Sequence, residues 1–469
     1  MNNPERAWLP DLVYKGGAFN RDLTLVSYAL GNIASIDASS KPDNVTRLTN
    51  RALLPGLINA HSHAFQRVIR GRTEYRTGHT RDSFWTWREM MYSAAARLSP
   101  DDLYDASRMA FLEMALSGVT TVGEFHYLHK QADGTAYDDP NLLAKQVVRA
   151  AHDVGLRIAL LRVAYARSGF QIEANPKQAR FLEQDPDVYL TNLSQLRSDL
   201  AAMESDAWVG IAPHSVRAVT LEYLKRIISF GNEQELPIHM HVAEQAAEVS
   251  ACIQEHGRSP IALLETEGLL SERFTGVHGI HITPKAARML ADARAMVCAC
   301  PTTERSLGDG VFPAEIYFRE DVGVSLGTDS QIQINLLEDS RELEYYLRLQ
   351  KRERAVLAPE HTADANGRTS ALAARLFECA TANGARSLGF NGGELESDTP
   401  ADFFTVDLDD SSIAGSSSDD VLSIIVFSLS RTAVKDVVVG GKQIVADGRH
   451  DDQEEIVARF TALQQRLWS

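Results

Sequence analysis

The sequence predicts an α/β fold, a (β/α)8 TIM-like barrel with a small β-sandwich domain built from both chain ends. Short apolar, β-rich runs recur at residues 54–60, 119–125, 157–165, 207–213, 236–242, 274–280, 295–300 and 322–326. Helical patterns lie between most of these runs, for example at residues 140–154 and 221–230. Eight strands that alternate with helices are typical of a parallel barrel, whose active site lies at the carboxyl ends of the strands.

The two ends of the chain differ from this middle part. Residues 1–53 and 391–450 contain short strand-like runs separated by turns, among them 23–28, 47–53, 402–406, 434–439 and 443–445. We expect these segments to pair into one small domain beside a barrel at residues 54–390, with a C-terminal helix at 451–469. Residues 411–420 are rich in Ser, Gly and Asp and are predicted to form a loop.

Composition limits the classes of partner. The chain has 469 residues and a net charge of −16, which disfavours binding to nucleic acid and to anionic membranes. No run approaches the roughly 20 apolar residues that cross a bilayer, and the N-terminus lacks a signal peptide's apolar segment. The four cysteines form no CxxC pair, although Cys298 and Cys300 share a strand face. We expect a soluble, cytoplasmic protein with reduced thiols.

Residues that bind transition metals gather near the predicted strand ends. His61 and His63 are two residues apart, so on a strand they point the same way. His241 and Asp329, at two other strand ends, complete three nitrogens and one carboxylate. Catalytic zinc uses such ligands and leaves one position to water. His239 is a competing candidate on the same strand, but His241 lies nearer the strand's carboxyl end. The pattern therefore predicts a metallo-hydrolase.

Five longer motifs narrow this prediction. They are His61-Ser62-His63-Ala64-Phe65-Gln66, Gly123-Glu124-Phe125-His126-Tyr127, Pro213-His214-Ser215-Val216-Arg217, His239-Met240-His241-Val242-Ala243-Glu244-Gln245 and Cys300-Pro301-Thr302-Thr303-Glu304. With these motifs nearly the whole chain resembles the amidohydrolase superfamily, and within it the formimidoylglutamate deiminase branch, which acts in histidine degradation. Arg305-Ser306 and Gln331 depart from the branch's pattern, which leaves details of the last two strand-end loops open.

The resemblance implies a mechanism and a cofactor. His61, His63, His241 and Asp329 would hold one metal ion per subunit, because residues 208–216 lack the lysine that bridges two ions in binuclear relatives. Zinc is the expected metal, and iron can use the same ligands. Zinc makes hydroxide available near neutral pH. Asp329 would accept the water proton, His278 would steady the tetrahedral centre or relay protons, and Glu244 would protonate the departing nitrogen.

The substrate that the resemblance implies is N-formimino-L-glutamate, a small anionic compound with two carboxylates. Arg217 and Arg88 are the expected carboxylate partners, since guanidinium forks match carboxylates bidentately. Gln66, Tyr127 and His214 would hydrogen-bond the same substrate. Arg162 on the third predicted strand is a rival to Arg88, which lies in the long connection at residues 64–100. That connection is either a lid over the site or a segment whose aromatic residues anchor a helix on the barrel rim. The resemblance also implies a homodimer, which is usual in the family.

Two alternatives stay open at this stage. A purine or aminopurine deaminase of the same superfamily would need a flat aromatic slot in place of paired arginines. The second alternative is a non-catalytic barrel that serves as a scaffold. Such a relative would usually have lost metal ligands, which this chain retains.

Overall fold

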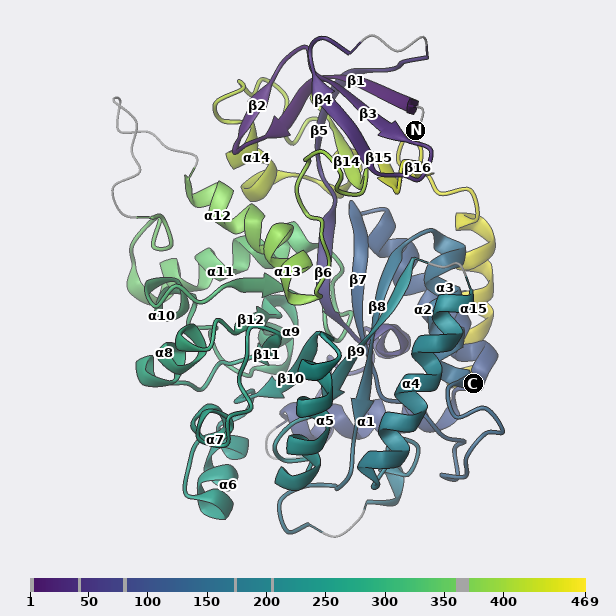
Figure 1. Cartoon of the computed structure of the whole chain (residues 1–469), viewed down its shortest axis with the longest axis vertical. Coiled ribbons are helices and arrows are strands. Elements are labelled where there is room, and N and C mark those ends of the chain that lie inside the picture. Colours follow the sequence, from purple (N-terminus) through teal and green to yellow (C-terminus); the bar gives the residue numbers. More distant parts are fainter. Residues whose placement is uncertain (1–3, 41–43, 79–81, 173–174, 204–205, 360–370) are drawn as a thin grey trace.

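Eight parallel strands form the central sheet of the molecule (Figure 1). The computed structural model describes residues 4–40, 44–78, 82–172, 175–203, 206–359 and 371–469. The strands pair in sequence order and are β6 (Leu57–Ser62), β7 (Val119–His126), β8 (Arg157–Ala164), β9 (Ala207–Pro213), β10 (Ile238–Val242), β11 (Phe274–His278), β12 (Met296–Ala299) and β13 (Val324–Leu326).

The first and last strands meet just beyond their carboxyl ends. The backbone N–H of Asp329 donates to the carbonyl oxygen of His61 at 3.1 Å, and the N–H of His63 donates to the carbonyl oxygen of Asp329 at 3.0 Å. These bonds join two ends of the sheet that are more than 260 residues apart in sequence. The predicted TIM-like barrel is confirmed, and its closure lies among the predicted metal ligands.

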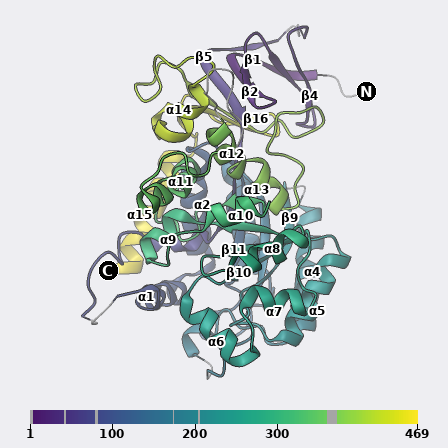
Figure 2. The same ribbon diagram turned by 90° about the vertical axis from the view of Figure 1, so that its left-hand side faces the viewer.

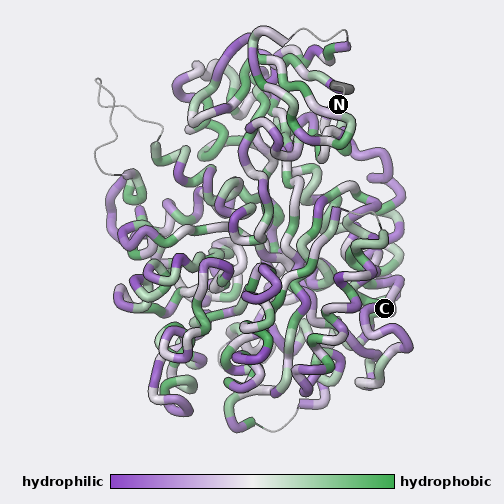
Figure 3. The backbone as a smooth tube through the Cα atoms, viewed as in Figure 1, coloured by the Kyte–Doolittle hydropathy of each residue, from purple (hydrophilic) through white to green (hydrophobic). Residues whose placement is uncertain are grey.

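Helices cover the outside of the sheet. They include α2 (Pro100–Ala115), α3 (Leu142–Val154), α4 (Pro186–Ala202), α5 (Leu221–Glu233), α6 (Ala246–His256), α7 (Pro260–Thr266), α8 (Pro284–Asp292), α9 (Pro301–Leu307), α10 (Ala314–Arg319), α11 (Leu336–Lys351), α12 (Ala371–Cys379) and α13 (Ala382–Ser387). Hydrophobic and hydrophilic segments alternate along their tubes (Figure 3). In α3 the buried side chains include Leu143, Val147 and Val154, which share one helical face against the barrel.

The barrel strands themselves are buried along nearly their whole length. Every residue of β6, β7, β8, β10 and β11 is buried. Both faces of a barrel strand are covered, one by the interior and one by helices, which explains why these runs are apolar without alternation. The predicted first strand began at residue 54, but Leu54 and Pro55 belong to the preceding strand β5 (Thr46–Pro55) and pair with the C-terminal part of the chain.

A second sheet combines strands from both ends of the chain, as predicted. Its members are β1 (Pro4–Lys15), β2 (Ala18–Asn20), β3 (Thr24–Tyr28), β4 (Ile33–Asp37), β5, β14 (Phe403–Asp407), β15 (Val434–Val439) and β16 (Lys442–Val445). The sheet is mixed, because β1 pairs with β5 in parallel and the other pairs are antiparallel. Trp8, Val13 and Phe403 contribute to its separate buried cluster.

This second sheet lies at the end of the barrel where the barrel strands begin (Figures 1 and 2). Strand β5 leads through Gly56 directly into the amino-terminal end of β6. A Cβ at Gly118, just before β7, would lie 3.0 Å from the ring of Phe404, and one at Gly155, before β8, would lie 2.5 Å from Ile444. The carboxyl ends of the strands are therefore free to form a cavity.

Two further helices come from the C-terminal region. Helix α14 (Val421–Ser428) follows the predicted loop at residues 411–420, and α15 (Gln453–Trp468) packs against α2. The Arg459 side chain of α15 donates to Asp105 of α2 at 2.7 Å. Within the described residues, none of the helices combines the length and the hydropathy that a bilayer crossing requires.

Candidate metal centre and active site

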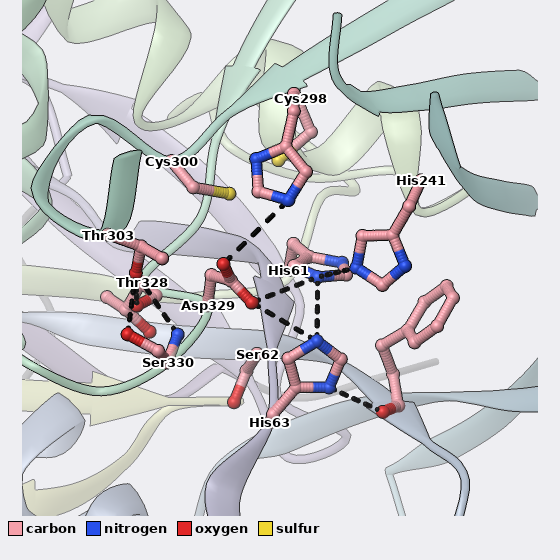
Figure 4. A network of polar contacts seen from close by, with 12 residues as sticks. His61, Ser62, His63, His241, Cys298, Cys300, Thr303, Thr328, Asp329 and Ser330 are labelled. Atoms are coloured by element: carbon pink, nitrogen blue, oxygen red, sulfur yellow. Dashed lines mark hydrogen bonds and ion pairs between the residues drawn. The ribbon is translucent and has the colours of Figure 1, made fainter. Parts of the chain in front are cut away.

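Three histidines and one aspartate converge at the carboxyl ends of β6, β10 and β13 (Figure 4). The Nε2 atoms of His61 and His63 are 3.2 Å apart, and those of His61 and His241 are 3.1 Å apart. Oδ1 of Asp329 lies 3.1 Å from Nε2 of His63 and 3.5 Å from Nε2 of His61. A zinc–ligand distance of about 2.0–2.1 Å places tetrahedral ligand atoms about 3.3 Å apart. The four residues therefore fit one common cation.

Hydrogen bonds on the far side of the rings favour this ligand set. Nδ1 of His63 lies 2.9 Å from the carbonyl oxygen of Phe125, and Nδ1 of His241 lies 3.2 Å from that of His214. An Nδ1–H that donates to a carbonyl leaves Nε2 unprotonated, the state that binds a metal. Such nitrogens repel one another at 3.1–3.2 Å unless a cation lies between them, so the donor set itself indicates a metal.

The electrostatics of the buried site agree with that state. Burial lowers the pKa of His61 to about 3 and holds the pKa of His241 well below its usual value. Burial by itself raises the pKa of Asp329, but hydrogen bonds with His61 and His63 hold it well below its usual range. Neutral imidazoles and an ionised carboxylate are the forms that coordinate divalent metals.

A buried hydrogen-bond network connects the strands that carry these ligands. The Ser62 hydroxyl donates to Oε2 of Glu124 at 2.6 Å, and the N–H of Ala64 donates to Oε1 at 2.8 Å. Nε2 of Gln331 donates to the Ser62 hydroxyl at 2.8 Å and to the carbonyl oxygen of Asp329 at 3.0 Å. Gln331, which departs from the branch's pattern, thus ties the first strand to the last.

Backbone strain is concentrated at the same strand ends. Asp329, Gln331, Ala243 and His278 have φ values of 44°, 61°, 51° and 70°, in the left-handed region that side chains other than glycine rarely adopt. Such residues persist where the surrounding structure holds them, and they cluster at functional sites. Here the strained backbone aims the Asp329 and His278 side chains at the common centre.

His278 lies between the metal candidates and a second set of carboxylates. Its Nε2 is 3.7 Å from Oε1 of Glu244 and 3.8 Å from Oδ2 of Asp329, and its Nδ1 is 3.2 Å from Oε1 of Glu304. Burial by itself lowers the pKa of His278, but these three carboxylates raise it well above its usual value. Burial raises the pKa of Glu244, with added repulsion from Asp329 and Glu304. A proton can therefore reside in this cluster at neutral pH.

One cavity joins this centre to the predicted substrate residues. It has an empty volume of about 520 Å³, part of which is open to solvent. Among its lining residues are predicted metal ligands and catalytic groups together with all five predicted substrate contacts, namely His63, His241, Asp329, Glu244, His278, Gln66, Arg88, Tyr127, His214 and Arg217. His61 lies deeper, behind the lining, and is fully buried.

Both arginines of the cavity retain unused hydrogen-bond donors. Nη1 of Arg217 and Nε of Arg88 are buried and have no hydrogen-bond partner among the described residues. Burial by itself lowers the pKa of Arg217, but nearby tyrosines and the carboxylates of Glu248 and Glu244 raise it, so the side chain stays charged. A buried cation with a free N–H is a binding position for an anionic ligand.

The rival residues have other partners. Arg162 donates to Glu183 at 2.5 Å and to the side-chain oxygen of Asn141 at 3.1 Å, and it is fully buried outside the cavity lining. Nε2 of His239 lies 2.7 Å from the carbonyl oxygen of Ser387, deeper in the barrel than His241. Neither residue lines the cavity.

The connection at residues 64–100 contributes one wall of the cavity. Within it, η1 (Ala64–Ile69) carries Gln66. Helix α1 (Phe84–Arg97) is capped by Ser83, whose side chain forms a capping box with Thr86. Phe84, Trp87 and Arg88 face the cavity from α1. The guanidinium of Arg88 lies 4.5 Å from the ring centroid of Trp85, a cation–π contact that holds the arginine in place.

Sequence reasoning missed several residues of this site. Tyr92 and Tyr165 line the cavity, and Glu304 contacts His278. Tyr165 closes the predicted run 157–165, so its strand-end position was a usable signal, whereas nothing in the sequence marked Tyr92. Cys300, to which the sequence assigned no role, lies with His278 and Asp329 in a second group of ligand atoms that are within 4.8 Å of one another.

Known proteins resemble the chain over most of its length. Residues 52–444 match the sequence model described as the Amidohydrolase family. Formimidoylglutamate deiminase of Pseudomonas aeruginosa is 36% identical over 457 residues, 97% of each chain. 5-Methylthioadenosine/S-adenosylhomocysteine deaminase of Pyrococcus abyssi is 27% identical over 90% of this chain and 89% of its own. A crystal structure of an amidohydrolase from Brucella melitensis superposes with a TM-score of 0.90 at 32% identity, over 99% of this chain and 100% of that one.

Proposed function

Because the chain belongs to the amidohydrolase family, we propose that it hydrolyses N-formimino-L-glutamate to N-formyl-L-glutamate and ammonia. It is a metal-dependent hydrolase that acts on a carbon–nitrogen bond. The observation that carries the finer proposal is the pairing, in one cavity, of the four-ligand metal centre with two buried arginines that have free N–H groups. The 36% identity to a formimidoylglutamate deiminase, over 97% of the chain, supports the same substrate.

We propose one zinc ion per chain, held by His61, His63, His241 and Asp329. The ligand atoms of His61, His63 and His241 and the Asp329 carboxylate lie 3.1–3.5 Å apart in their closest pairs, as expected around one common ion. When bound, zinc would supply the Lewis acidity that lowers the pKa of a water molecule from 15.7 to about 7.

The chain's own residues then move the protons. Asp329 accepts a proton from the attacking water while the water oxygen bonds to the planar formimino carbon. His278 lies between Asp329 and Glu244. It stabilises the oxygen that becomes the formyl oxygen, and it relays protons between the two carboxylates. Glu244, whose raised pKa keeps it protonated more readily, gives a proton to the nitrogen. Asp329 then gives its proton to the same nitrogen, and Glu244 takes the remaining proton of the attacking oxygen. The carbon–oxygen double bond forms as the carbon–nitrogen bond breaks and ammonia leaves. The nitrogen has to be protonated first, because an unprotonated amidine nitrogen is a poor leaving group.

We assign substrate recognition to the cavity residues that do not bind the metal. The net charge of −16 would repel a dicarboxylate, so local cations must offset it. Arg88 and Arg217 provide that charge, and Gln66, Tyr127 and His214 provide neutral hydrogen-bonding groups beside it. Burial and the two arginines lower the pKa of His214 well below its usual value, so that its ring is neutral.

The decisive experiment compares substrates on zinc-loaded protein. Ammonia release is measured from N-formimino-L-glutamate, from 5′-methylthioadenosine and from guanine. Turnover restricted to the formimino compound supports the proposal. Turnover restricted to a purine compound would move the chain to the aminopurine deaminases, the alternative that the Pyrococcus relative represents. Metal analysis gives the second readout, since we expect about one zinc per chain, whereas a scaffold barrel needs none.

A further inference from the structure

We propose that Tyr92 and Tyr165 bind the substrate carboxylate held by Arg217, and that Gln178 positions their hydroxyl groups for this contact. The inference rests on the proposed function and extends its recognition site by three residues. Each of the three lies outside the set of substrate contacts that the sequence indicated.

The two tyrosines approach the cavity from different parts of the chain. Tyr92 lies on α1, and Tyr165 directly follows β8. Both line the cavity with Arg88 and Arg217, and both are only 2% exposed. Buried tyrosine hydroxyls ordinarily have hydrogen-bond partners, because leaving one unpaired costs free energy.

Gln178 supplies one shared partner. It ends the short helix η2 (Pro176–Gln178) in the loop after β8 and is 1% exposed. Its Nε2 donates to the hydroxyl oxygen of Tyr92 at 2.7 Å and to that of Tyr165 at 2.6 Å. Both hydrogens of the amide are thereby used. A phenol that accepts a hydrogen bond keeps its own O–H as a donor. The two phenols also hydrogen-bond each other, so one hydroxyl hydrogen joins the pair until a carboxylate, a stronger acceptor, takes it up, and the other is available to the cavity.

The surroundings make these hydrogens suited to an anion. Arg217 is close enough to both tyrosines and Arg88 close enough to Tyr92 for their charges to act on the phenols. The guanidinium of Arg88 lies 5.4 Å from the ring centroid of Tyr92. Burial raises the pKa of Tyr92, so it stays a neutral donor beside the two cations. A carboxylate at Arg217 has several lone pairs, and the hydroxyls can satisfy those that the guanidinium leaves.

A second amide–phenol pair lines the same cavity. Nε2 of Gln66 donates to the hydroxyl oxygen of Tyr127 at 2.8 Å. In both pairs a buried side-chain amide occupies an acceptor position of a phenol, which leaves the phenol hydrogen for another partner. The Tyr127 hydroxyl donates to the Met91 sulfur at 3.7 Å, a weak acceptor that a carboxylate can replace.

The test uses full-length, zinc-loaded protein and removes single hydroxyls. Tyr92→Phe and Tyr165→Phe keep the rings, and each should raise KM for N-formimino-L-glutamate about tenfold, with kcat changed much less. Tyr189→Phe is the matched control, because that buried hydroxyl donates to the carbonyl oxygen of Arg162 at 2.6 Å, outside the cavity lining. The control should leave KM unchanged. Wild-type KM in both cavity variants would overturn the proposal.

Gln178 variants separate positioning from packing. In Gln178→Glu the carboxylate would accept the hydroxyl hydrogens of both tyrosines and turn them away from the substrate, so KM should rise more than in Gln178→Met. A purely structural role predicts equal effects. In the Tyr165→Phe background the extra effect of the glutamate should shrink, since one of the hydroxyls is already absent.

A binding measurement distinguishes failure of this inference from failure of the proposed function. If the wild-type enzyme does not turn over N-formimino-L-glutamate, calorimetry with L-glutamate as a dicarboxylate probe still reports on the site. Weaker glutamate binding in Tyr92→Phe and Tyr165→Phe than in Tyr189→Phe would support the hydroxyl site on its own. Equal binding, or no binding by any form, counts against it.

Discussion

Replacing Arg217 with methionine removes one of the two arginines that line the cavity. The Arg217 side chain is buried and charged, and its Nη1 has no hydrogen-bond partner among the described residues. A hydrogen bond from this N–H to a carboxylate contributes about 1.5–3 kcal/mol. Each 1.4 kcal/mol corresponds to about a tenfold change in affinity, so KM should rise about ten- to a hundredfold. Methionine keeps much of the apolar volume, which limits the effect on packing.

The assay is steady-state ammonia release, with zinc content measured on the same samples. Arg226→Met is the control, because Arg226 lies on α5 in an exposed ion pair with Asp187 at 3.1 Å. A substrate analogue that lacks one carboxylate allows a double-mutant-type cycle between the protein and the substrate. If the analogue lacks the carboxylate that Arg217 binds, the variant and the wild type should have the same KM for it. An unchanged KM for the full substrate, at full zinc content, would refute the reasoning and make Arg217 a structural residue.

Four further outcomes are expected. His63→Ala should lose zinc and activity together, whereas the exposed His152→Ala should retain both, as metal analysis and ammonia release will show. Glu244→Gln should keep about one zinc yet lose most of kcat, and retention of most of the rate would reject its role as proton donor. Glu124→Gln keeps one acceptor oxygen for the Ser62 and Ala64 donors. It should weaken zinc binding about 10- to 100-fold, as measured by competition with a chelator. Its kcat should be near that of the wild type once zinc is saturating. Chelator treatment of the wild type should abolish activity, and zinc should restore it; activity that persists without metal contradicts the whole scheme.

Local sequence patterns were sufficient for the barrel and for the grouping of the four predicted metal ligands. A strand has a side-chain period of two, so His61 and His63 must share a face wherever that strand lies. Parallel strands of one barrel also bring their carboxyl ends to the same rim. Those two rules are enough to place His241 and Asp329 near the first two histidines, and the structure brings all four together.

The partners of individual polar side chains were decided by tertiary packing. The sequence predicted Arg88 as a substrate contact and left Arg162 as a rival. In the structure Arg162 is hydrogen-bonded to Glu183 and Asn141, while Arg88 lines the cavity. Gln178 and Tyr92, 86 residues apart, meet only because the loop after β8 packs against α1. Hydrogen bonds reach about 3 Å, so contacts between distant segments depend on loop paths. Periodicity specifies which way a side chain points along its own element, but it carries no information about those paths.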